Sequence, residues 1–362
     1  MDVADKNFLL TSTTEDYVYP DLVTYRVKDL GLVEEIFKPV LYSIVFTCGL
    51  VGNALVLWIL IWFKKLASVT DIYLLNMAIS DLLFVFSLPF VVYAIKYEWE
   101  FGDAMCKILS AVYYIGFFSS IFFVIVLSVD RYLAIVHVVF SLKFRTMHLG
   151  IIVTLSVWAC SFIFSLPHFI FHKQSIKDGF KYCSVSYSEN QEVTMTLLSY
   201  LQINLFGLII PFAVLFFCYS RIIKNLQNSK SRQKKYAVKL IFIIVAVFFL
   251  FWTPYNIVVF LKFLELLGIF NLTLQDLYNF SETLNTAMDI TQTISFIHCC
   301  LNPIIYTFAG ENFQKHLYRM FRKLLKCMKV NKVCGSFENS VIDRVSSTTR
   351  ESRSSSFTEA VV

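Results

Sequence analysis

Residues 107–132 read KILSAVYYIGFFSSIFFVIVLSVDRY, an apolar run that closes with Asp-Arg-Tyr at 130–132. Another apolar run, near residues 285–309, contains Asn-Pro-Ile-Ile-Tyr at 302–306. Matches of three or five residues occur by chance, so neither motif alone says much. Their placement is informative, because they lie at the inner ends of the third and the last of seven apolar stretches. This order predicts an all-α membrane protein built as a seven-helix bundle.

Composition supports a membrane protein. The chain has 362 residues, of which 57% are apolar, whereas soluble domains average about 45–50%. Seven stretches have the roughly 20 apolar residues that a helix needs to cross a bilayer core. They lie near 40–63, 72–95, 107–129, 149–171, 196–220, 240–263 and 285–309. A soluble fold is excluded because its core could not cover so many helices that are apolar all round.

The placement of lysine and arginine gives the orientation. Residues 221–239 carry seven basic residues and no acid, whereas the connection 96–103 is mixed or acidic. We therefore expect the N-terminus outside the plasma membrane and the C-terminus inside. Residues 1–38 lack a long apolar run, so the first span is expected to act as the targeting signal. The net charge of +6 is attributed to basic residues on the cytoplasmic side, which set the topology and contact membrane lipids. It is not interpreted as a sign of nucleic-acid binding.

One helical bundle and two tails account for the whole chain. Residues 1–38 are predicted to form an acidic extracellular tail, and residues 39–310 the bundle. In residues 311–329, apolar positions recur at three- and four-residue steps with basic residues between them. This pattern predicts an amphipathic eighth helix on the inner membrane surface. Residues 330–362 are rich in Ser and Thr and are expected to be disordered.

The nine cysteines divide by compartment. Cys106 opens the third span on the outside, and Cys183 lies in the outer loop 172–195. Only these two lie in oxidising space, so we expect a disulfide between them. Cys327 and Cys334 are cytoplasmic and near the membrane, and either or neither could carry a palmitoyl group. The other five are interpreted as packing residues, and no spacing suggests a metal site.

The outer segments carry motifs for modification. Sequons begin at Asn271 and Asn279, between the sixth and seventh spans, which agrees with the predicted topology. In residues 15–21, Tyr17 and Tyr19 alternate with acids, a pattern that favours sulfation in the secretory pathway. Such a tail would capture a basic protein partner by charge. The alternative is an ordinary solvated tail.

Asp81 is interpreted as the only carboxylate deep in any apolar span. A buried ionised acid costs several kcal/mol unless it is paired. One interpretation is a structural acid satisfied by Asn53 and Asn302. The other is a sodium or water site that changes between two states of the protein. Further donors to that site are expected from the polar residues of neighbouring spans, Ser120, His298 and Asn302.

Arg131 follows Asp130 at the cytoplasmic edge, where the two can form a local pair. Release of the arginine to a partner would make the pair a switch, although an arginine that merely snorkels to the interface is the alternative. Five prolines interrupt spans, and each one could simply shape its helix. The segment 251–254, Phe-Trp-Thr-Pro, is the best hinge candidate, because the ring of Trp252 lies below the expected ligand cavity.

Longer motifs narrow the family. They read DRYLAIVH at 130–137, HCCLNPIIY at 298–306, FAGENF at 308–313, SDLLFVFS at 80–87 and YYIGF at 113–117. With them the chain resembles the chemokine receptors, seven-helix receptors that couple to G proteins, and in particular their CC type. The segments 16–21 and 352–356 resemble most the type-eight group. The resemblance covers residues 15 to about 328.

The resemblance implies a cell-surface receptor, not an enzyme, which binds small basic chemokines. No cofactor is expected, apart from the sodium ion of the second interpretation of Asp81. The tail would hold the chemokine, whose N-terminus enters a cavity. Expected partners are an inhibitory-type heterotrimeric G protein, receptor kinases, arrestin and membrane lipids. The site residues implied are Tyr17, Tyr19, Tyr42, Tyr113 and Gln292 for the ligand, and Asp130, Arg131, Tyr132, Tyr219, Trp252 and Tyr306 for switching and coupling.

Three features depart from the family pattern. The family usually has a second outer cysteine pair, but residues 1–40 and 262–298 contain no Cys. It usually has an acid where Gln292 stands, so no acid is expected to remain in the cavity for a ligand's amino group. Ser87 replaces the usual Thr of a Thr-x-Pro motif. These departures would suit a diverged copy, such as one carried by a large DNA virus.

Two alternatives stay open. A scavenging receptor would bind chemokine without G-protein signalling, but the intact segment 130–136 argues against it. A seven-helix transporter or proton pump would need several charges along a path inside the membrane. Since only Asp81 is expected there, that alternative is disfavoured.

Overall fold

The computed structural model describes residues 36–177, 179–188, 190–227, 232–270 and 272–309, together with residue 322. By contact clustering the chain divides into residues 1–310 and residues 311–362. The predicted eighth helix and both tails, apart from residues 36–38 and 322, lie outside the described residues.

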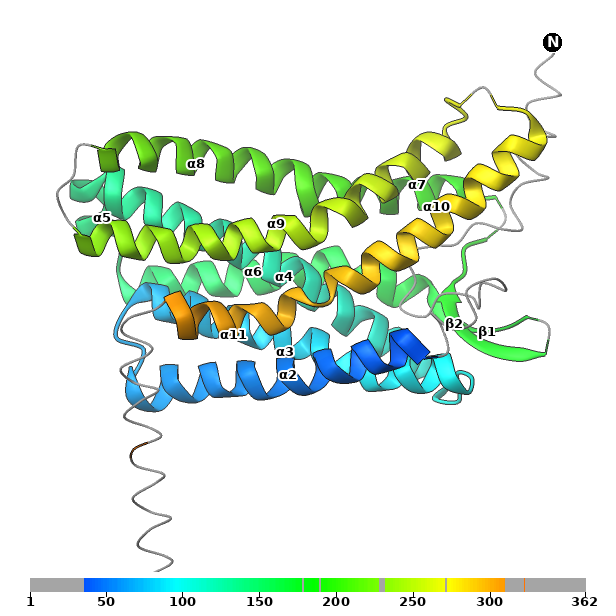
Figure 1. Ribbon diagram of the computed structural model, residues 1–362, viewed down its shortest axis with the longest axis horizontal. Coiled ribbons are helices and arrows are strands. Elements are labelled where there is room, and N and C mark those ends of the chain that lie inside the picture. Colours follow the sequence, from blue (N-terminus) through cyan, green and yellow to red (C-terminus); the bar gives the residue numbers. More distant parts are fainter. Residues whose placement is uncertain are drawn as a thin grey trace, which may run out of the picture. The chain divides into compact units, whose positions relative to one another are not determined.

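Helices make up nearly all of the described part (Figure 1). They are α2 (Lys38–Trp58) with the π-helical turn η3 (Ile59–Phe63), α3 (Val69–Lys96), α4 (Gly102–Val136), α5 (Val138–Phe144), α6 (Met147–Phe171), α7 (Glu192–Asn204) with η4 (Leu205–Ile209), α8 (Ile210–Gln227), α9 (Arg232–Leu266), α10 (Leu274–Ser295) and α11 (His298–Ala309). Two strands, β1 (His172–Lys177) and β2 (Phe180–Val185), form an antiparallel hairpin.

The helices extend beyond the apolar stretches at most ends, and polar side chains cap three of the starts. Ser68 and Asp71 form a capping box at the start of α3, and Thr146 and Thr273 cap α6 and α10 with their side chains. Each cap satisfies backbone N–H groups that have no partner within the helix. At these three starts the end of the helix is therefore set by a cap and not by hydrophobicity alone.

Six helical segments of the described chain are long and apolar enough to cross a membrane. The seventh, α10 followed by α11, is divided at residues 296–297, and α10 carries many polar residues. In sequence order, α2–η3, α3, α4, α6, α7–α8, α9 and α10–α11 give the seven segments. The prediction of an all-α membrane bundle is confirmed at this level.

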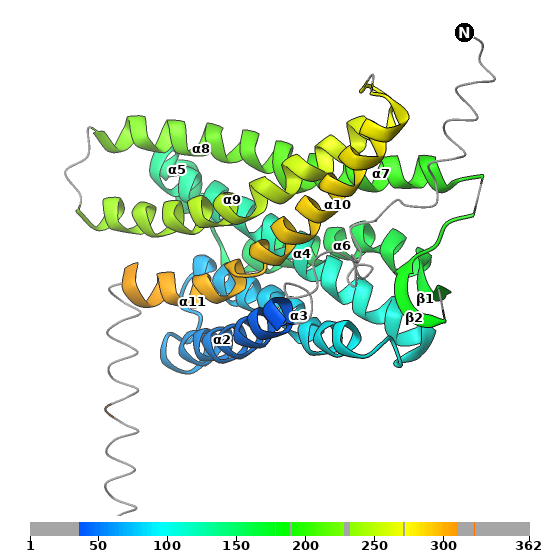
Figure 2. The same ribbon diagram turned by 45° about the vertical axis from the view of Figure 1, so that its right-hand side comes forward.

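Helix α4 lies at the centre of the bundle and contacts α3, α6, α8 and α9. The ends of the ring meet, since α11 packs against α2 and α10 against α9 (Figures 1 and 2). Gly116 permits the close approach of α4 to α3, because a Cβ there would lie 3.1 Å from the Ser80 carbonyl oxygen. Packing this close orders the polar groups between the helices.

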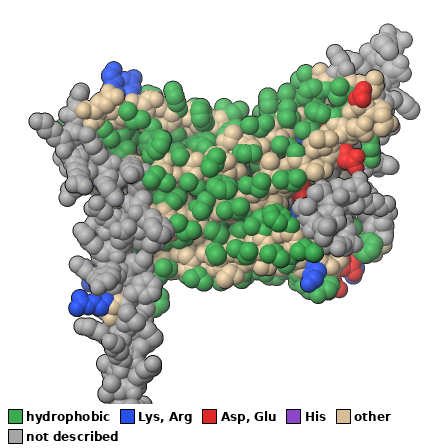
Figure 3. Space-filling view, viewed as in Figure 1, with side chains coloured by type: hydrophobic (Ala, Val, Ile, Leu, Met, Phe, Trp, Pro, Cys, Tyr) green, Lys and Arg blue, Asp and Glu red, His purple; other side chains and the backbone are tan. Residues whose placement is uncertain are grey.

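Apolar side chains cover much of the outside of the bundle, as Figure 3 shows for one face. Large exposed examples lie on several helices: Trp62, Phe86, Leu155, Phe162, Phe216 and Leu250. Contiguous apolar surface of this kind marks contact with a membrane. Charged side chains in the same view lie toward the two ends of the helices.

Candidate functional site

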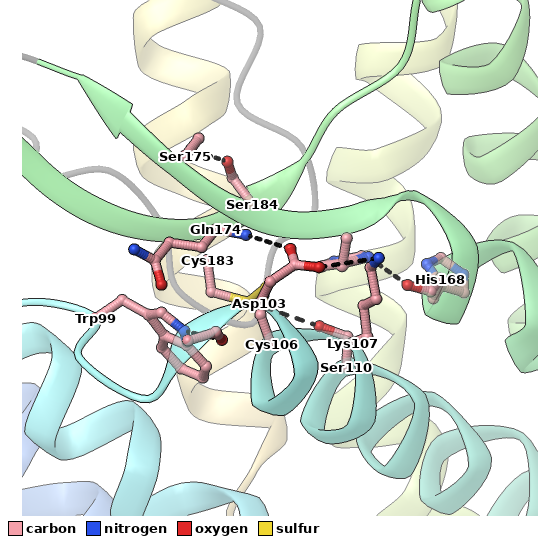
Figure 4. The surroundings of a disulfide bond; sticks show 12 residues. Trp99, Asp103, Cys106, Lys107, Ser110, His168, Gln174, Ser175, Cys183 and Ser184 are labelled. Carbon is pink, nitrogen blue, oxygen red and sulfur yellow. Dashed lines mark hydrogen bonds and ion pairs between the residues drawn. A yellow bond between two sulfur atoms is a disulfide. The ribbon is translucent and has the colours of Figure 1, made fainter.

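A disulfide joins Cys106, in the first turn of α4, to Cys183 in β2, with the two Cα atoms 5.5 Å apart (Figure 4). The prediction from compartments is confirmed. A carboxylate oxygen of Asp103 also accepts a hydrogen bond from the backbone N–H of Gln174, at 3.1 Å. Two links therefore hold the hairpin over the outer end of α4. The buried Trp99 adds a third, because its backbone N–H donates to the Lys181 carbonyl at 2.9 Å.

The predicted ligand residues of the bundle meet around one aromatic ring. The Gln292 side-chain amide donates to the Tyr113 hydroxyl at 3.1 Å, and the Tyr42 hydroxyl lies 3.0 Å from Thr293 Oγ1. The Phe296 ring is 5.1 Å from that of Tyr42 and 6.0 Å from that of Tyr113. Helices α2, α4 and α10 thus contribute to one buried cluster. Its polar groups form hydrogen bonds between the helices.

Asp81 is not the only buried carboxylate of the bundle, and sequence analysis did not predict the others. Asp289 in α10 is buried, and its Oδ2 lies 2.5 Å from Lys38 Nζ in α2. Glu265 in α9 is also buried and lies 3.0 Å from Lys262 Nζ. Both acids are retained in the apolar bundle because each is paired with a buried lysine. Asp289 lies one helical turn from Gln292, but it is already paired with Lys38.

Asp81 lies in a cluster with α4 and α11. Asn302 Nδ2 donates to one carboxylate oxygen at 2.7 Å, and Ser120 Oγ to the other at 3.4 Å. His298 Nε2 is 4.0 Å from the latter oxygen. Asn53 does not join them, contrary to one interpretation of the sequence, because its amide donates to the carbonyl oxygens of Gly49 and Cys299.

The donor atoms of the Asp81 cluster are of mixed type. The carboxylate and the Ser120 hydroxyl are oxygen donors, which suit sodium as a hard cation. Sequence analysis missed Cys299, whose Sγ lies with Asp81 and His298 in a group whose ligand atoms are all within 4.8 Å of one another. Thiol and imidazole suit softer metals. The carboxylate and hydroxyl nevertheless fit a monovalent cation, with Asn302 orienting the acid.

Trp252 connects the Asp81 cluster to the helix that contains Pro254. Its buried ring lies 4.6 Å from the ring of Phe117 in α4 and 5.2 Å from that of His298 in α11. Pro254 follows within α9, where it removes a backbone hydrogen bond. A bend at this proline would therefore move a ring that touches two other helices.

At the inner end, Asp130 is shared by two arginines. Arg131 Nη2 lies 2.5 Å from Asp130 Oδ2, and Arg145 Nε lies 2.7 Å from Asp130 Oδ1. The hydroxyl of Thr70, in α3, donates to the same acid at 3.0 Å and accepts from both arginines. Sequence analysis predicted the pair of Asp130 and Arg131 but not Thr70 or Arg145. The sequence does not show that they meet Asp130, because Thr70 lies at the start of α3 and Arg145 directly follows α5.

The remaining coupling residues lie close to this network or outside the description. The Tyr132 hydroxyl is 3.0 Å from His137 Nε2, and the ring of the buried Tyr219 is 5.4 Å from that of Phe242 in α9. Tyr306 lies in α11, but its side chain is outside the described residues, as are Tyr17, Tyr19, Asn271 and Cys327. Asn279 is exposed in the helix α10, whereas its sequon partner Ser281 accepts a hydrogen bond from Lys262 at 3.0 Å.

This arrangement defines a seven-helix membrane receptor with an outer polar cluster and an inner ionic network. The sequence profile of the 7 transmembrane receptor (rhodopsin family) matches residues 52–306, and the chain belongs to that family. Within it, the chain is a member of the C-C chemokine receptors, with which it shares 41–44% identity over most of its length. It is a multi-pass protein of the plasma membrane and, like its family, a receptor and not an enzyme.

Three relatives give the scale of the similarity. C-C chemokine receptor type 4 of Homo sapiens is 44% identical over 352 residues, which are 97% of this chain and 96% of the relative. C-C chemokine receptor type 8 of Homo sapiens is 41% identical over 87% of this chain and 88% of the relative. Type 1 of Homo sapiens is 42% identical over 86% of each. These values are too similar to single out type eight, which the tail motifs favoured.

Proposed function

We propose that this chain is a cell-surface receptor that binds CC-type chemokines and signals through an inhibitory-type heterotrimeric G protein. Calcium mobilisation and chemotaxis would follow. The observation that carries the signalling half is the network of Asp130, Arg131, Arg145 and Thr70. It holds an arginine at the inner end through contacts that a partner protein can replace, because Arg131 and Arg145 remain 15% and 31% exposed.

Ligand capture is proposed to take two steps. The acidic tail around Tyr17 and Tyr19 attracts the basic chemokine by charge. The chemokine's N-terminus then reaches the cluster of Tyr42, Tyr113 and Gln292, in which Gln292 donates a hydrogen bond to Tyr113 and Tyr42 pairs with Thr293. Those groups can exchange partners without leaving a buried donor unpaired.

Transmission is proposed to run from that cluster through Phe296, Trp252 and the Asp81 cluster. Phe84 connects the outer cluster with the Asp81 cluster, since its ring is 4.9 Å from that of Tyr113 and 5.7 Å from that of His298. A sodium ion or water held by Asp81 and Ser120 would stabilise one of two arrangements. Receptor kinases and arrestin would act on the Ser/Thr-rich segment 330–362, and lipids would contact the basic segment 311–329.

Two measurements on the same transfected cells test the proposal. A panel of labelled CC chemokines should include at least one that binds saturably, and that chemokine should stimulate guanine-nucleotide exchange in membranes. Cells that carry an empty vector are the control. Saturable binding without stimulated exchange would support the scavenging receptor instead. Absence of binding by every CC chemokine, with the receptor detected at the surface, would contradict the proposal.

A further inference from the structure

Helix α2 and the seventh segment lie side by side along a polar seam. From the outer to the inner end, the contacts are Lys38 with Asp289, Tyr42 with Thr293, the Val45 carbonyl with Cys300 Sγ, and Asn53 with the Cys299 carbonyl. The first three pairs advance along both segments in the same direction, so the two segments run parallel. Near the inner end a Cβ on Gly52 would lie 2.8 Å from the Pro303 ring, which shows how closely they approach.

The outermost contact of the seam differs from the rest because both side chains are charged. The side chains of Lys38 and Asp289 are only 4% and 5% exposed, and their charged atoms are 2.5 Å apart. Removing two charges from water costs about as much as their attraction returns, so a buried pair is weak evidence for added stability. Loss of one partner is a different matter, because the other charge is then buried alone. Such a pair therefore enforces one particular arrangement of the helices that carry it.

No covalent link performs this task in the described part of the chain. The disulfide there ties α4 to β2 and reaches neither α2 nor α10. Residues 1–40 and 262–298 contain no cysteine at all. The outer end of α2 follows the acidic tail, and α10 follows the connection 267–273. Anything that fixes α2 against α10 fixes the points from which these two outer segments start.

We propose that Lys38 and Asp289 are positioning residues for ligand binding, a buried ionic clamp that holds the start of the first helix against the seventh and so keeps Tyr42 and Gln292 in place for the ligand. The role in ligand binding rests on the proposed function, which supplies the ligand, a basic protein. The clamp itself does not depend on that function. Tyr42 and Thr293 lie one turn below and continue the seam toward the Gln292 cluster. A loosened clamp would therefore disturb the cluster below, which the ligand is proposed to reach.

A double-mutant cycle on the full-length receptor in lipid nanodiscs tests the clamp without any ligand. Lys38→Met and Asp289→Asn should each lower the thermal midpoint by about 5–10 °C, because each leaves one buried charge alone. The double variant should recover most of that loss, and Lys38→Arg should stay near wild type. Unfolding can be followed with a thiol-reactive dye that reports exposure of the buried Cys218 and Cys299. Deuterium uptake in residues 39–46 and 285–292 should rise in the single variants only.

Lys64→Met is the matched control, because it breaks another lysine–aspartate pair, with Asp71, at the inner end of the bundle. It should leave deuterium uptake at the outer end unchanged. Additive effects of Lys38→Met and Asp289→Asn would overturn the clamp, as would single variants that match wild type in both midpoint and uptake.

The binding role is tested with the labelled CC chemokine that binds best in the panel above. Per folded receptor, the single variants should bind it about tenfold more weakly, while Lys38→Arg and the Lys64→Met control stay within about twofold. Coupling in the thermal cycle with unchanged affinity would reduce the pair to a structural role and overturn the positioning role. If no chemokine binds even the wild-type receptor, the proposed function fails and the positioning role falls with it, while the thermal cycle still decides the clamp.

Discussion

At the outer end of the bundle, a disulfide joins α4 to β2 and the pair of Lys38 and Asp289 is buried. At the inner end, Asp130 is shared by two arginines that remain 15% and 31% exposed. The disulfide and the buried pair are therefore hard to exchange, whereas the contacts of the two arginines compete with water and with any protein that docks there. The difference indicates that the outer end is fixed to receive a ligand and the inner end is built to rearrange.

The largest effect is expected from breaking the outer covalent link. Cys106→Ser should lower the amount of folded surface receptor at least tenfold, because a disulfide that closes a long loop stabilises by about 2–4 kcal/mol. Surface labelling measures the loss, and mass mapping of unreduced protein should find the linked peptides. Cys160→Ser is the control, since Cys160 is a free and exposed cysteine. Normal folding of the Cys106→Ser receptor would show that the outer end does not depend on this link.

The inner end should respond in function and not in folding. Asp130→Asn removes the acid that both arginines share, so ligand-independent nucleotide exchange should rise by about tenfold, the effect of one charge-assisted hydrogen bond. Surface expression should change little. Asp276→Asn, at the exposed start of α10, is the control at the opposite end. A basal rate that stays at the wild-type level would remove the reason to regard the acid as a restraint.

Between the two ends, Gln292 tests how the ligand is recognised. Gln292→Glu should raise agonist potency several-fold, because charge-assisted hydrogen bonds are roughly twice as strong as neutral ones. Asp289, already paired with Lys38, should not substitute for this acid. Replacement of Tyr17 and Tyr19 with Phe should lower binding, most visibly at low salt. Concentration–response curves for exchange measure the first effect; if both changes are silent, the proposed division between tail and cluster is wrong.

The smallest effect is expected at the Asp81 cluster. Sodium chloride should raise the thermal midpoint by about 2–4 °C relative to choline chloride at equal ionic strength. Asp81→Asn should abolish the difference, because it removes the charged oxygen donor of the cluster. An equal response of both receptors to sodium would exclude Asp81 as the ion's ligand and leave it as a structural acid held by Asn302.

The seven spans could be predicted because a bilayer demands long apolar helices, and the disulfide because only two cysteines lie on the outer side. The buried acid Asp289 was missed for a physical reason. Its burial depends on Lys38, which is distant in sequence, and composition does not reveal which helix faces which. Thr70 and Arg145 were missed for the same reason. They contact Asp130 only because three segments distant in sequence meet at one point. Asn53 was assigned to Asp81 by residue type, but the helix geometry turns it toward the Cys299 carbonyl.

The account depends most directly on Arg131, and one experiment tests it. Chemokine-stimulated nucleotide exchange should be measured in membranes that carry the wild-type receptor or Arg131→Ala, with labelled chemokine binding on the same membranes as the control. Arg131→Ala should bind chemokine with wild-type affinity and give no stimulated exchange, because its contacts lie at the inner end, away from the outer cluster. Stimulated exchange at the wild-type level in that variant would contradict the account.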